Sequence, residues 1–573
     1  MLAISKDTNS FKWVIVLSII PILLFFYTFF SYVSNIPFQD DYDALLEPVT
    51  AFKNMPHFSW NEFVKIIWTQ DDERRIVLDR VIALLIYAVH GSLDLRIQMF
   101  VGLLSIIGLL YFFYTIIKGA QLPAILLLCC ALLLFHIQYY EAIFWGMIPL
   151  QHIIVYFFAI GTFYNLYSPT PVRIITAVLM GILAIFSDVS GTFVLPAGIA
   201  VLILQRQWKY VAIWVIAMGA MIWLYYHNLE IPAYRPKLSD NLAHPKLIIY
   251  NFLAFSGISA DANTLFAHTN RVTLILFTGM ILWGVLFYYA FLLLKHSFFS
   301  HDIYVFPRWK ITLWGSIIHL SIIIIAFAVG RAMDGPEAVL ISRYKHIGFI
   351  WLILISILVF THLKSNYIQL GSKIWLGISL CIFGFSYFEY LAPLDFYYKE
   401  RNTDIYGWQH NRALPSSPIY VSLKSAVDTI TEQAIASGIY QLPEPYFFDQ
   451  PYQVDSSRFP LNVDYNDSIL SFHNETYTRN TGKNDGAYIV LKSATQNHII
   501  PGRQKRFSLK SYLFSMGNKY YANGFTGSFS AAYLSPDQVY DIYIVTIEGH
   551  KKLVHPTKYQ ISNINSQISV KEI

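Results

Sequence analysis

Long apolar runs, each close to the length that crosses a lipid bilayer, are the feature that most constrains how this chain can fold. They recur between residues 11 and 391 and contain few charged residues. A helix of about 20 apolar residues spans the hydrocarbon core with every backbone group hydrogen-bonded internally. Only 13% of all residues are charged, roughly half the share usual in soluble domains. The sequence therefore predicts an α-helical polytopic membrane protein.

We expect about eleven transmembrane helices. The first run, residues 11–33, is too long for a signal-peptide core and lacks a small-residue cleavage site, so we interpret it as a retained span. Two short runs flank Asp188 and form either two short spans or one broken or re-entrant element. The expected spans lie near residues 11–33, 96–117, 122–140, 150–167, 173–187, 190–205, 210–227, 272–294, 311–330, 346–363 and 374–391.

Basic residues in the short connections indicate the orientation. They fall on alternate sides of successive spans, and the positive-inside rule places them in the cytoplasm. The N-terminus is then cytoplasmic, and the segments 34–95 and 228–271 and the C-terminal tail are extracytoplasmic. The residues that set this orientation are Lys6, Lys12, Lys118, Arg173, Arg206, Lys209, Lys295, Arg308, Lys310, Lys364 and Lys373.

The domain organisation follows from the change in composition near the end of the apolar runs. Residues 1–395 form the predicted transmembrane domain, with a first external loop over 34–95 that contains an amphipathic interfacial helix near 76–90. Residues 396–449 are predicted to be an extracytoplasmic linker with a helical stretch. Residues 450–573 alternate between polar and apolar side chains with turn residues between the runs, which predicts a small antiparallel β-sandwich.

Ionisable residues gather at the predicted outer ends of the spans, and this asymmetry is the main functional signal. The inner loops carry mainly the basic residues that topology explains, whereas the outer loops carry both signs of charge. Charged groups near hydrocarbon are costly and are often functional. The outer set comprises Asp40, Asp41, Asp43, Asp71, Asp72, Glu73, Arg74, Arg75, Glu141, His152, Asp188, Arg331, Asp334, Glu337, Arg343 and Lys345.

Three neighbouring carboxylates follow the first span in the segment Gln39-Asp40-Asp41-Tyr42-Asp43. Mutual repulsion between partly desolvated carboxylates raises one of their pKa values unless cations compensate, and catalytic sites often tolerate such an arrangement. An isolated outer Asp–Arg pair, by contrast, is explained equally well as an interfacial salt bridge. The three aspartates are therefore the strongest candidates for a functional role.

Three short motifs resemble those of the GT-C superfamily of integral-membrane glycosyltransferases, most closely its uncharacterised bacterial members. They are Asp72-Glu73-Arg74-Arg75-Ile76, Trp145-Gly146 followed by Gln151, and Gly330-Arg331 followed by Ser342-Arg343-Tyr344. The first motif departs from the usual form at Asp72 and Arg74 and matches it at Glu73 and Arg75. The resemblance covers about residues 10–400 and excludes the tail.

The resemblance implies transfer of a sugar from a polyprenyl-phosphate donor to a glycan or glycolipid acceptor at the outer face of a bacterial inner membrane. A carboxylate would accept the proton of the acceptor hydroxyl, and cations would hold the lipid phosphate as its charge develops. We assign the base to Asp40 or Asp41, with a slight preference for Asp41. The donor-phosphate candidates are Arg75, Arg331, Arg343, Arg74 and Tyr344, and the acceptor or orienting candidates are Glu73, Glu141 and His152.

A divalent cation, Mg²⁺ or Mn²⁺, is compatible with this reaction, because Asp40, Asp41, Asp43 and Glu141 can converge if their loops do. The spacing identifies no particular metal, and some relatives need one while others do not. Nothing in the net charge of +5 indicates a nucleic-acid partner. The expected partners are the lipid-linked donor, the acceptor and the bilayer.

Three other functions compete with this prediction. An O-antigen polymerase or ligase also acts at the outer face, but its key arginines typically lie in a large late loop, whereas the loop 331–345 is short. A transporter or flippase places charges near the bilayer midplane, often in two related halves, and no convincing internal repeat is present. A non-catalytic external binding protein would need one anchor rather than eleven spans.

Overall fold

The computed structural model describes residues 8–261, 268–299, 306–416, 420–444, 452–480, 482–515, 520–565 and 567–573. The chain is mostly helical and ends in a β-sheet region, as the sequence predicts. It divides into two compact units. The helical unit comprises Met1–Ser31 and Ala51–Phe388, and the C-terminal unit comprises Tyr32–Thr50 and Glu389–Ile573.

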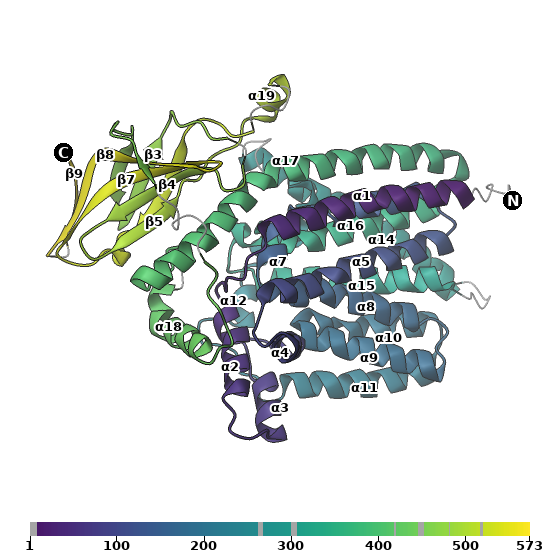
Figure 1. Cartoon of the computed structure of the whole chain (residues 1–573). Coiled ribbons are helices and arrows are strands. Elements are labelled where there is room, and N and C mark those ends of the chain that lie inside the picture. The colour runs from purple at the N-terminus through teal and green to yellow at the C-terminus, as the bar shows by residue number, and fades with distance from the viewer. Residues whose placement is uncertain are drawn as a thin grey trace. The chain divides into compact units, whose positions relative to one another are not determined.

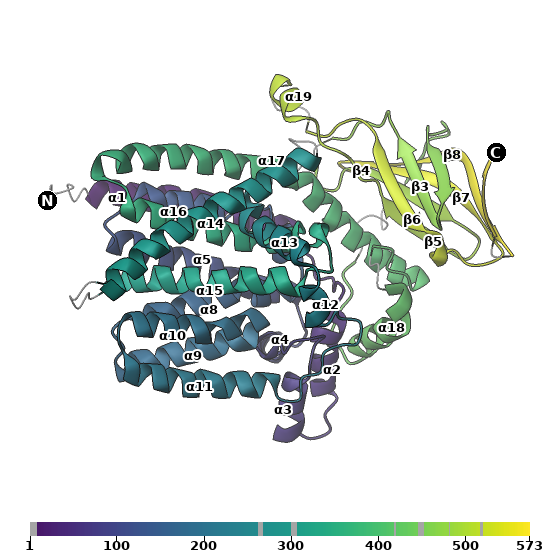
Figure 2. The same ribbon diagram turned by 180° about the vertical axis from the view of Figure 1, so that it is seen from behind.

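Seven helices in the described part of the chain are long and apolar enough to cross a membrane. Each coincides with a predicted span, and within the helical unit they run roughly side by side (Figures 1 and 2). These helices are α1 (Thr8–Tyr32), α5 (Leu95–Gly119), α11 (Trp208–Tyr226), α14 (His268–Phe299), α15 (Arg308–Gly330), α16 (Lys345–His362) and α17 (Ser365–Asn411).

The other four predicted spans coincide with shorter helices. These are α6 (Ile125–Leu134) with α7 (Tyr140–Phe144), η2 (Pro149–Ile153) with α8 (Ile154–Asn165), α9 (Pro171–Ser187), and η3 (Val189–Phe193) with α10 (Val194–Leu204). None of these helices reaches the roughly 20 residues that a straight crossing needs. The total of eleven crossings therefore stays a prediction.

The break between α9 and α10 has a local cause. The Asp188 carboxylate accepts a hydrogen bond from the Ser190 backbone N–H at 2.9 Å and so caps η3. A Cβ atom on Gly191 would lie 2.0 Å from the Ala184 carbonyl oxygen, so the close turn requires glycine. Asp188 is thus the capping residue of a helix break.

Short helices fill the two long loops of the helical unit. The predicted interfacial helix corresponds to α4 (Val77–His90), which is seen end-on in Figure 1 and therefore crosses the direction of the bundle helices. The others in these loops are α2 (Glu47–Lys53), which the unit boundary divides, α3 (Trp60–Trp68), α12 (Leu238–Leu242), α13 (Pro245–Gly257) and η4 (Ile258–Ala260). The short loop 331–345 contains η5 (Pro336–Val339) and η6 (Ser342–Tyr344).

Two packed β-sheets form most of the C-terminal unit. One sheet has six strands in the order β1-β8-β7-β4-β5 with β9 on β8, and the other has the order β2-β3-β6. Neighbours are antiparallel except β1 and β8. The strands are β1 (Gln453–Val454), β2 (Asn462–Asn466), β3 (Ile469–Asn474), β4 (Gly486–Lys492), β5 (Asn497–Pro501), β6 (Phe525–Ser530), β7 (Gln538–Glu548), β8 (Lys551–Ile564) and β9 (Gln567–Glu572), with η7 (Ala531–Tyr533) and α19 (Leu509–Phe514) in the connections.

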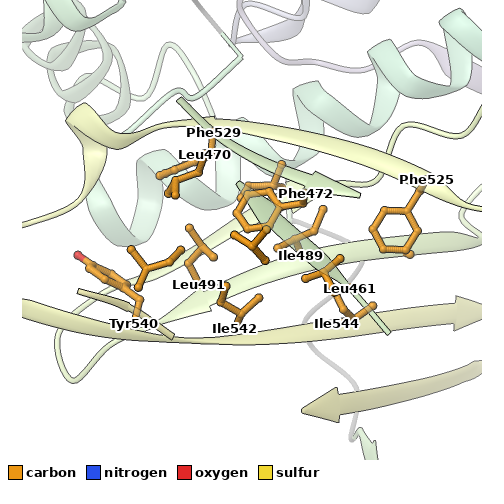
Figure 3. Close-up of a cluster of buried hydrophobic side chains, with 14 of the residues drawn as sticks. Leu461, Leu470, Phe472, Ile489, Leu491, Phe525, Phe529, Tyr540, Ile542 and Ile544 are labelled. Atoms are coloured by element: carbon orange, nitrogen blue, oxygen red, sulfur yellow. The ribbon is translucent and has the colours of Figure 1, made fainter. Parts of the chain in front are cut away.

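The core of this unit lies between its two sheets. Leu470 and Phe472 of β3 face Ile489 of β4 and Ile544 of β7 (Figure 3), because alternate side chains of each strand point to one face. Phe525 belongs to the same cluster. The alternating pattern predicted β-structure in the tail, and the structure has a β-sheet region there.

The predicted boundary at residue 395 falls inside a continuous helix. α17 contains Pro393 and continues to Asn411, followed by α18 (Tyr420–Ala436). Its last turns are not a linker, because Tyr406 packs with Tyr488 and Val490 of β4. Burial of these residues explains why the helix persists beyond the proline.

Candidate functional site

Two π-helical turns adjoin the residues that the sequence singles out. η1 (Tyr42–Leu46) begins directly after Asp41, and η2 (Pro149–Ile153) contains His152. A π-turn is rare and occurs frequently at functional sites, because the extra residue redirects neighbouring side chains. Asp41 and His152, both predicted site residues, therefore each adjoin or lie in a π-helical turn.

Arg343 stands out among the arginines of the helical unit. Its guanidinium lies over the rings of Trp145, at 5.3 Å, and of Tyr344, at 5.2 Å. The side chain is half-buried, and among the described residues its guanidinium forms no ion pair. Its Nε atom is buried without a hydrogen-bond partner in the described chain. A buried cation normally has a counter-charge, so this group is suited to bind an anion.

Glu141 fixes the backbone of this arginine. Its Oε2 atom accepts a hydrogen bond from the Arg343 N–H at 3.2 Å, and the Ser342 hydroxyl donates to the Gln138 carbonyl at 3.0 Å. Burial raises the pKa of Glu141, although Arg343 opposes this effect. Glu141 therefore positions η6, and its contact with an acceptor stays a prediction.

His152 lies where the arginines converge. Its ring stacks on that of Tyr344 with centroids 5.8 Å apart and an interplanar angle of 19°. Arg74, Arg331 and Arg343 all lie within electrostatic range of it. The structure thus brings together these three predicted arginines, Tyr344 and His152. The Nδ1 atom of His152 is buried without a hydrogen-bond partner among the described residues.

The three arginines differ in their counter-charges. Arg74 Nε lies 3.1 Å from the Asp71 carboxylate. Arg331 pairs with Asp334 at 2.9 Å. Within the cluster, Arg343 alone of the three has no carboxylate within ion-pairing distance of its guanidinium in the described chain, although its charge opposes the raised pKa of the buried Glu141.

An acidic pair borders the cluster and binds a fourth arginine. Arg235 contacts the Glu73 carboxylate at 2.8 Å and also pairs with Asp72, which accepts a hydrogen bond from the Tyr234 hydroxyl. Burial favours the neutral form of Asp72, but hydrogen bonds with its neighbours outweigh burial and lower its pKa to about 2. Burial and the hydrogen bond to Asp72 raise the pKa of Glu73. Arg331 lies 3.9 Å from the same Glu73 side chain.

Arg75 is occupied by backbone carbonyls. Its Nε donates to the Tyr225 carbonyl at 2.8 Å, one terminal nitrogen donates to His227 at 2.8 Å, and the other donates to Trp68. Its guanidinium also lies 5.2 Å from the Trp68 ring. These contacts engage all three guanidinium nitrogens and favour a structural role over the phosphate contact expected from the motif.

Asp40 and Asp41 belong to the C-terminal unit, so the cluster of the helical unit does not include them. Asp41 is fully buried, and its Oδ2 atom accepts a hydrogen bond from the Phe38 N–H at 2.9 Å. Asp40 is half-buried. The more accessible carboxyl is therefore Asp40, whereas the sequence slightly favoured Asp41.

Sequence reasoning missed Tyr234 and Arg235. They lie in the long predicted outer loop 228–271, apart from any motif, and meet Asp72 and Glu73 only through the fold. A basic residue in an extracytoplasmic loop, against the positive-inside trend, was the one signal that pointed to Arg235.

The described residues offer no group of three or more His, Cys, Asp or Glu side chains arranged to hold a metal ion. The carboxylates of Asp71, Asp72, Glu73 and Asp334 beside the cluster are engaged by arginines. No chemical step is assigned to a divalent cation. Comparison of the chain with protein-family models, curated proteins and solved structures finds no match.

Proposed function

We propose that this chain is an integral-membrane glycosyltransferase that moves a sugar from a polyprenyl-phosphate donor to a glycan or glycolipid acceptor. The observation that carries the proposal is the Arg343 guanidinium, stacked on two aromatic rings and without a carboxylate partner in the described chain. Arginine binds phosphate oxygens through its planar fork. The seven long apolar helices support a membrane setting for a lipid-linked donor.

The residues around Arg343 suit a leaving phosphate. As the acceptor hydroxyl oxygen attacks the anomeric carbon, the bond from that carbon to the phosphate oxygen breaks and its electron pair stays on the phosphate. Arg343 meets the added negative charge, whereas Arg74 and Arg331 beside it are each paired with a carboxylate. Tyr344 holds the guanidinium in place by stacking, and Trp145 does so from its own helix end.

The proton of the acceptor hydroxyl needs a base, and Asp40 or Asp41 is the candidate that comes from the sequence. We favour Asp40, because its carboxyl is more exposed than that of Asp41, which is held by the Phe38 N–H. We further propose that the reaction occurs at the extracytoplasmic face of a bacterial inner membrane, with the N-terminus in the cytoplasm. This orientation rests on the basic residues of the short connections.

The test is direct transfer. Membranes that contain the wild-type chain or Arg343→Ala are incubated with a panel of radiolabelled polyprenyl-phosphate sugars and with envelope glycolipid acceptors. We expect label in the glycolipid fraction with the wild type and a loss of about 100-fold with Arg343→Ala. Comparison of surface glycans with and without the gene separates the alternatives. Loss of a single side-branch sugar supports transfer, whereas loss of all polymer supports a polymerase or flippase and overturns the proposal.

A further inference from the structure

Helix α3 presents an apolar face that nothing in the described chain covers. No residue of α3 is buried. Trp60 is 70% exposed, Val64 is 49% exposed, and Phe58, directly before the helix, is 57% exposed. Residues 60, 63, 64 and 67 are apolar and lie on one face at helical spacing. Soluble surfaces rarely expose so many large apolar groups together.

The exposed aromatic rings are pre-arranged as a ridge. The ring centroids of Phe58 and Trp60 lie 5.1 Å apart, and those of Trp60 and Phe63 lie 5.8 Å apart, both with edge-to-face geometry. Phe52 adds a contact to Phe63 at 6.0 Å. Edge-to-face pairs of this kind hold one another in place. The ridge therefore keeps its shape without a covering element.

Arg75 fixes α3 at the end of a candidate span. It donates to the Trp68 carbonyl at the end of α3 and to the Tyr225 and His227 carbonyls at the end of α11. The Trp68 ring also lies 5.3 Å from Phe186, at the end of α9. Both views show α3 beside that end of α11 (Figures 1 and 2). Arg75 and Trp68 thus hold α3 beside the ends of the apolar helices α11 and α9.

The end of α11 is itself aromatic and exposed. Trp223 is 65% exposed and Tyr226 is 46% exposed. Aromatic residues of this kind concentrate where membrane helices meet the headgroup region. The ridge on α3 therefore continues a surface that already has the composition of a membrane boundary.

The charges of the α3 region suit a lipid surface. Lys53, His57 and Lys65 are exposed, against one exposed carboxylate, Glu62. On the helix, Glu62 and Lys65 lie away from the apolar face. An amphipathic helix with basic flanks is the pattern of segments that lie in the bilayer interface.

We infer that α3 and the preceding segment 56–59 dock on the surface of the bilayer, with Phe58, Trp60 and Val64 inserted at the level of the headgroups. This inference rests on the membrane setting proposed above but not on sugar transfer. We choose the bilayer as the partner that covers α3, because Arg75 holds α3 beside the end of α11, where a membrane-spanning helix would leave the hydrocarbon core. Docking of this helix would hold the loop that carries Glu73 and Arg74 at the membrane surface, where a lipid-linked phosphate lies.

Site-directed spin labelling of the full chain in vesicles of phosphatidylethanolamine and phosphatidylglycerol tests this inference. The background is Cys381→Ser, because Cys381 is the exposed cysteine and Cys129 and Cys130 are buried. Labels are placed by Val64→Cys on the apolar face, by Glu62→Cys on the opposite face, and by Ile216→Cys on α11, which is 72% exposed there. Collision rates with oxygen, which concentrates in the bilayer, and with a water-soluble nickel chelate report depth.

We expect the Val64 label to be oxygen-accessible and protected from nickel, at a depth of about 5–10 Å, and the Glu62 label to be nickel-accessible. Phe58→Ser combined with Trp60→Ser should shift the Val64 label toward water. Equal nickel access at positions 62 and 64, with position 216 protected, overturns the docking inference. Nickel access at position 216 overturns the membrane setting instead. Concentration-dependent dipolar broadening at position 64 would identify a second copy as the occupant and also overturn the inference.

Discussion

The Arg343 guanidinium lies over the Trp145 indole at 5.3 Å, and among the described residues it has no carboxylate partner. Its neighbours in the cluster are each neutralised, Arg74 by Asp71 and Arg331 by Asp334. A stacked guanidinium loses little freedom when it binds an anion, because its plane is already oriented. This difference ranks Arg343 above the other arginines as an anion ligand.

Replacement of Arg343 should therefore affect transfer most strongly. We expect Arg343→Ala to lower kcat/KM for the lipid-linked donor by about 100-fold or more, because the developing phosphate charge loses its unpaired cation. Arg343→Lys should lose less, since it keeps the charge but not the planar fork. Donor-dependent transfer in membranes measures both.

Arg96→Ala is the matched control, because Arg96 is a half-exposed arginine paired with Asp94 at 2.7 Å. It should transfer at the wild-type rate. Equal losses of transfer activity in Arg96→Ala and Arg343→Ala would show that the loss in Arg343→Ala comes from a general change in charge or folding, and not from a missing phosphate ligand.

Arg75→Ala separates the structural role from the phosphate role that the motif implies. Three carbonyls lose their donor, so we expect a loss of about 2–4 kcal/mol of stability and a lower unfolding temperature in detergent. Arg75→Lys should not rescue it, since one ammonium cannot satisfy carbonyls on both α3 and α11. A stably folded Arg75→Ala variant that has lost donor binding would restore the motif-based assignment.

The helices were predictable because the signal is local. A run of apolar residues such as 96–117 predicts a helix from its own composition, and α5 (Leu95–Gly119) follows it closely. The end of α17 was not predictable in this way. Its last turns are polar in sequence and remain helical because Tyr406 is buried against β4, a contact between residues far apart in the chain.

The site was predictable to the extent that its residues lie in motifs. Tyr344 stacks on His152, and Arg331 and Arg343 lie within electrostatic range of it. Arg235 was missed because no local pattern links it to Glu73, which is 162 residues away. Ion pairing between distant loops is set by tertiary structure, and a single sequence does not record it.

The two candidate bases should behave differently. Asp40→Asn should abolish transfer and leave the unfolding temperature unchanged, because its carboxyl is partly exposed. Asp41→Asn should retain most activity, since the amide oxygen can still accept the Phe38 N–H. Asp41→Ala removes that acceptor from a buried site and should lower stability by about 1 kcal/mol.

Transfer assays paired with thermal unfolding distinguish these outcomes. Inactive, stable Asp41→Asn beside active Asp40→Asn would reverse the assignment. Full activity in both would eliminate the first-loop aspartates as the base.

Glu73 should give the protein a pH-dependent stability opposite in sign to that of Asp72. Because burial raises the pKa of Glu73 above its ordinary value of 4.5, its contribution is fully present below pH 4.5 and is lost as pH rises through the raised pKa. Asp72, whose pKa is lowered from 3.8 to about 2, contributes stability above pH 3.8 that is lost as pH falls toward 2. Above pH 4.5, Glu73 therefore contributes a loss of stability, while the contribution of Asp72 is already complete. Glu73→Gln should therefore shrink the fall in unfolding temperature across this range, while Glu62→Gln, at an exposed carboxyl of α3, should leave that fall unchanged.

An unaltered pH profile in Glu73→Gln would contradict this prediction. It would mean that the Glu73 carboxyl of the wild type ionises as readily in the folded chain as in the unfolded one, with Arg235 and Arg331 fully compensating its burial.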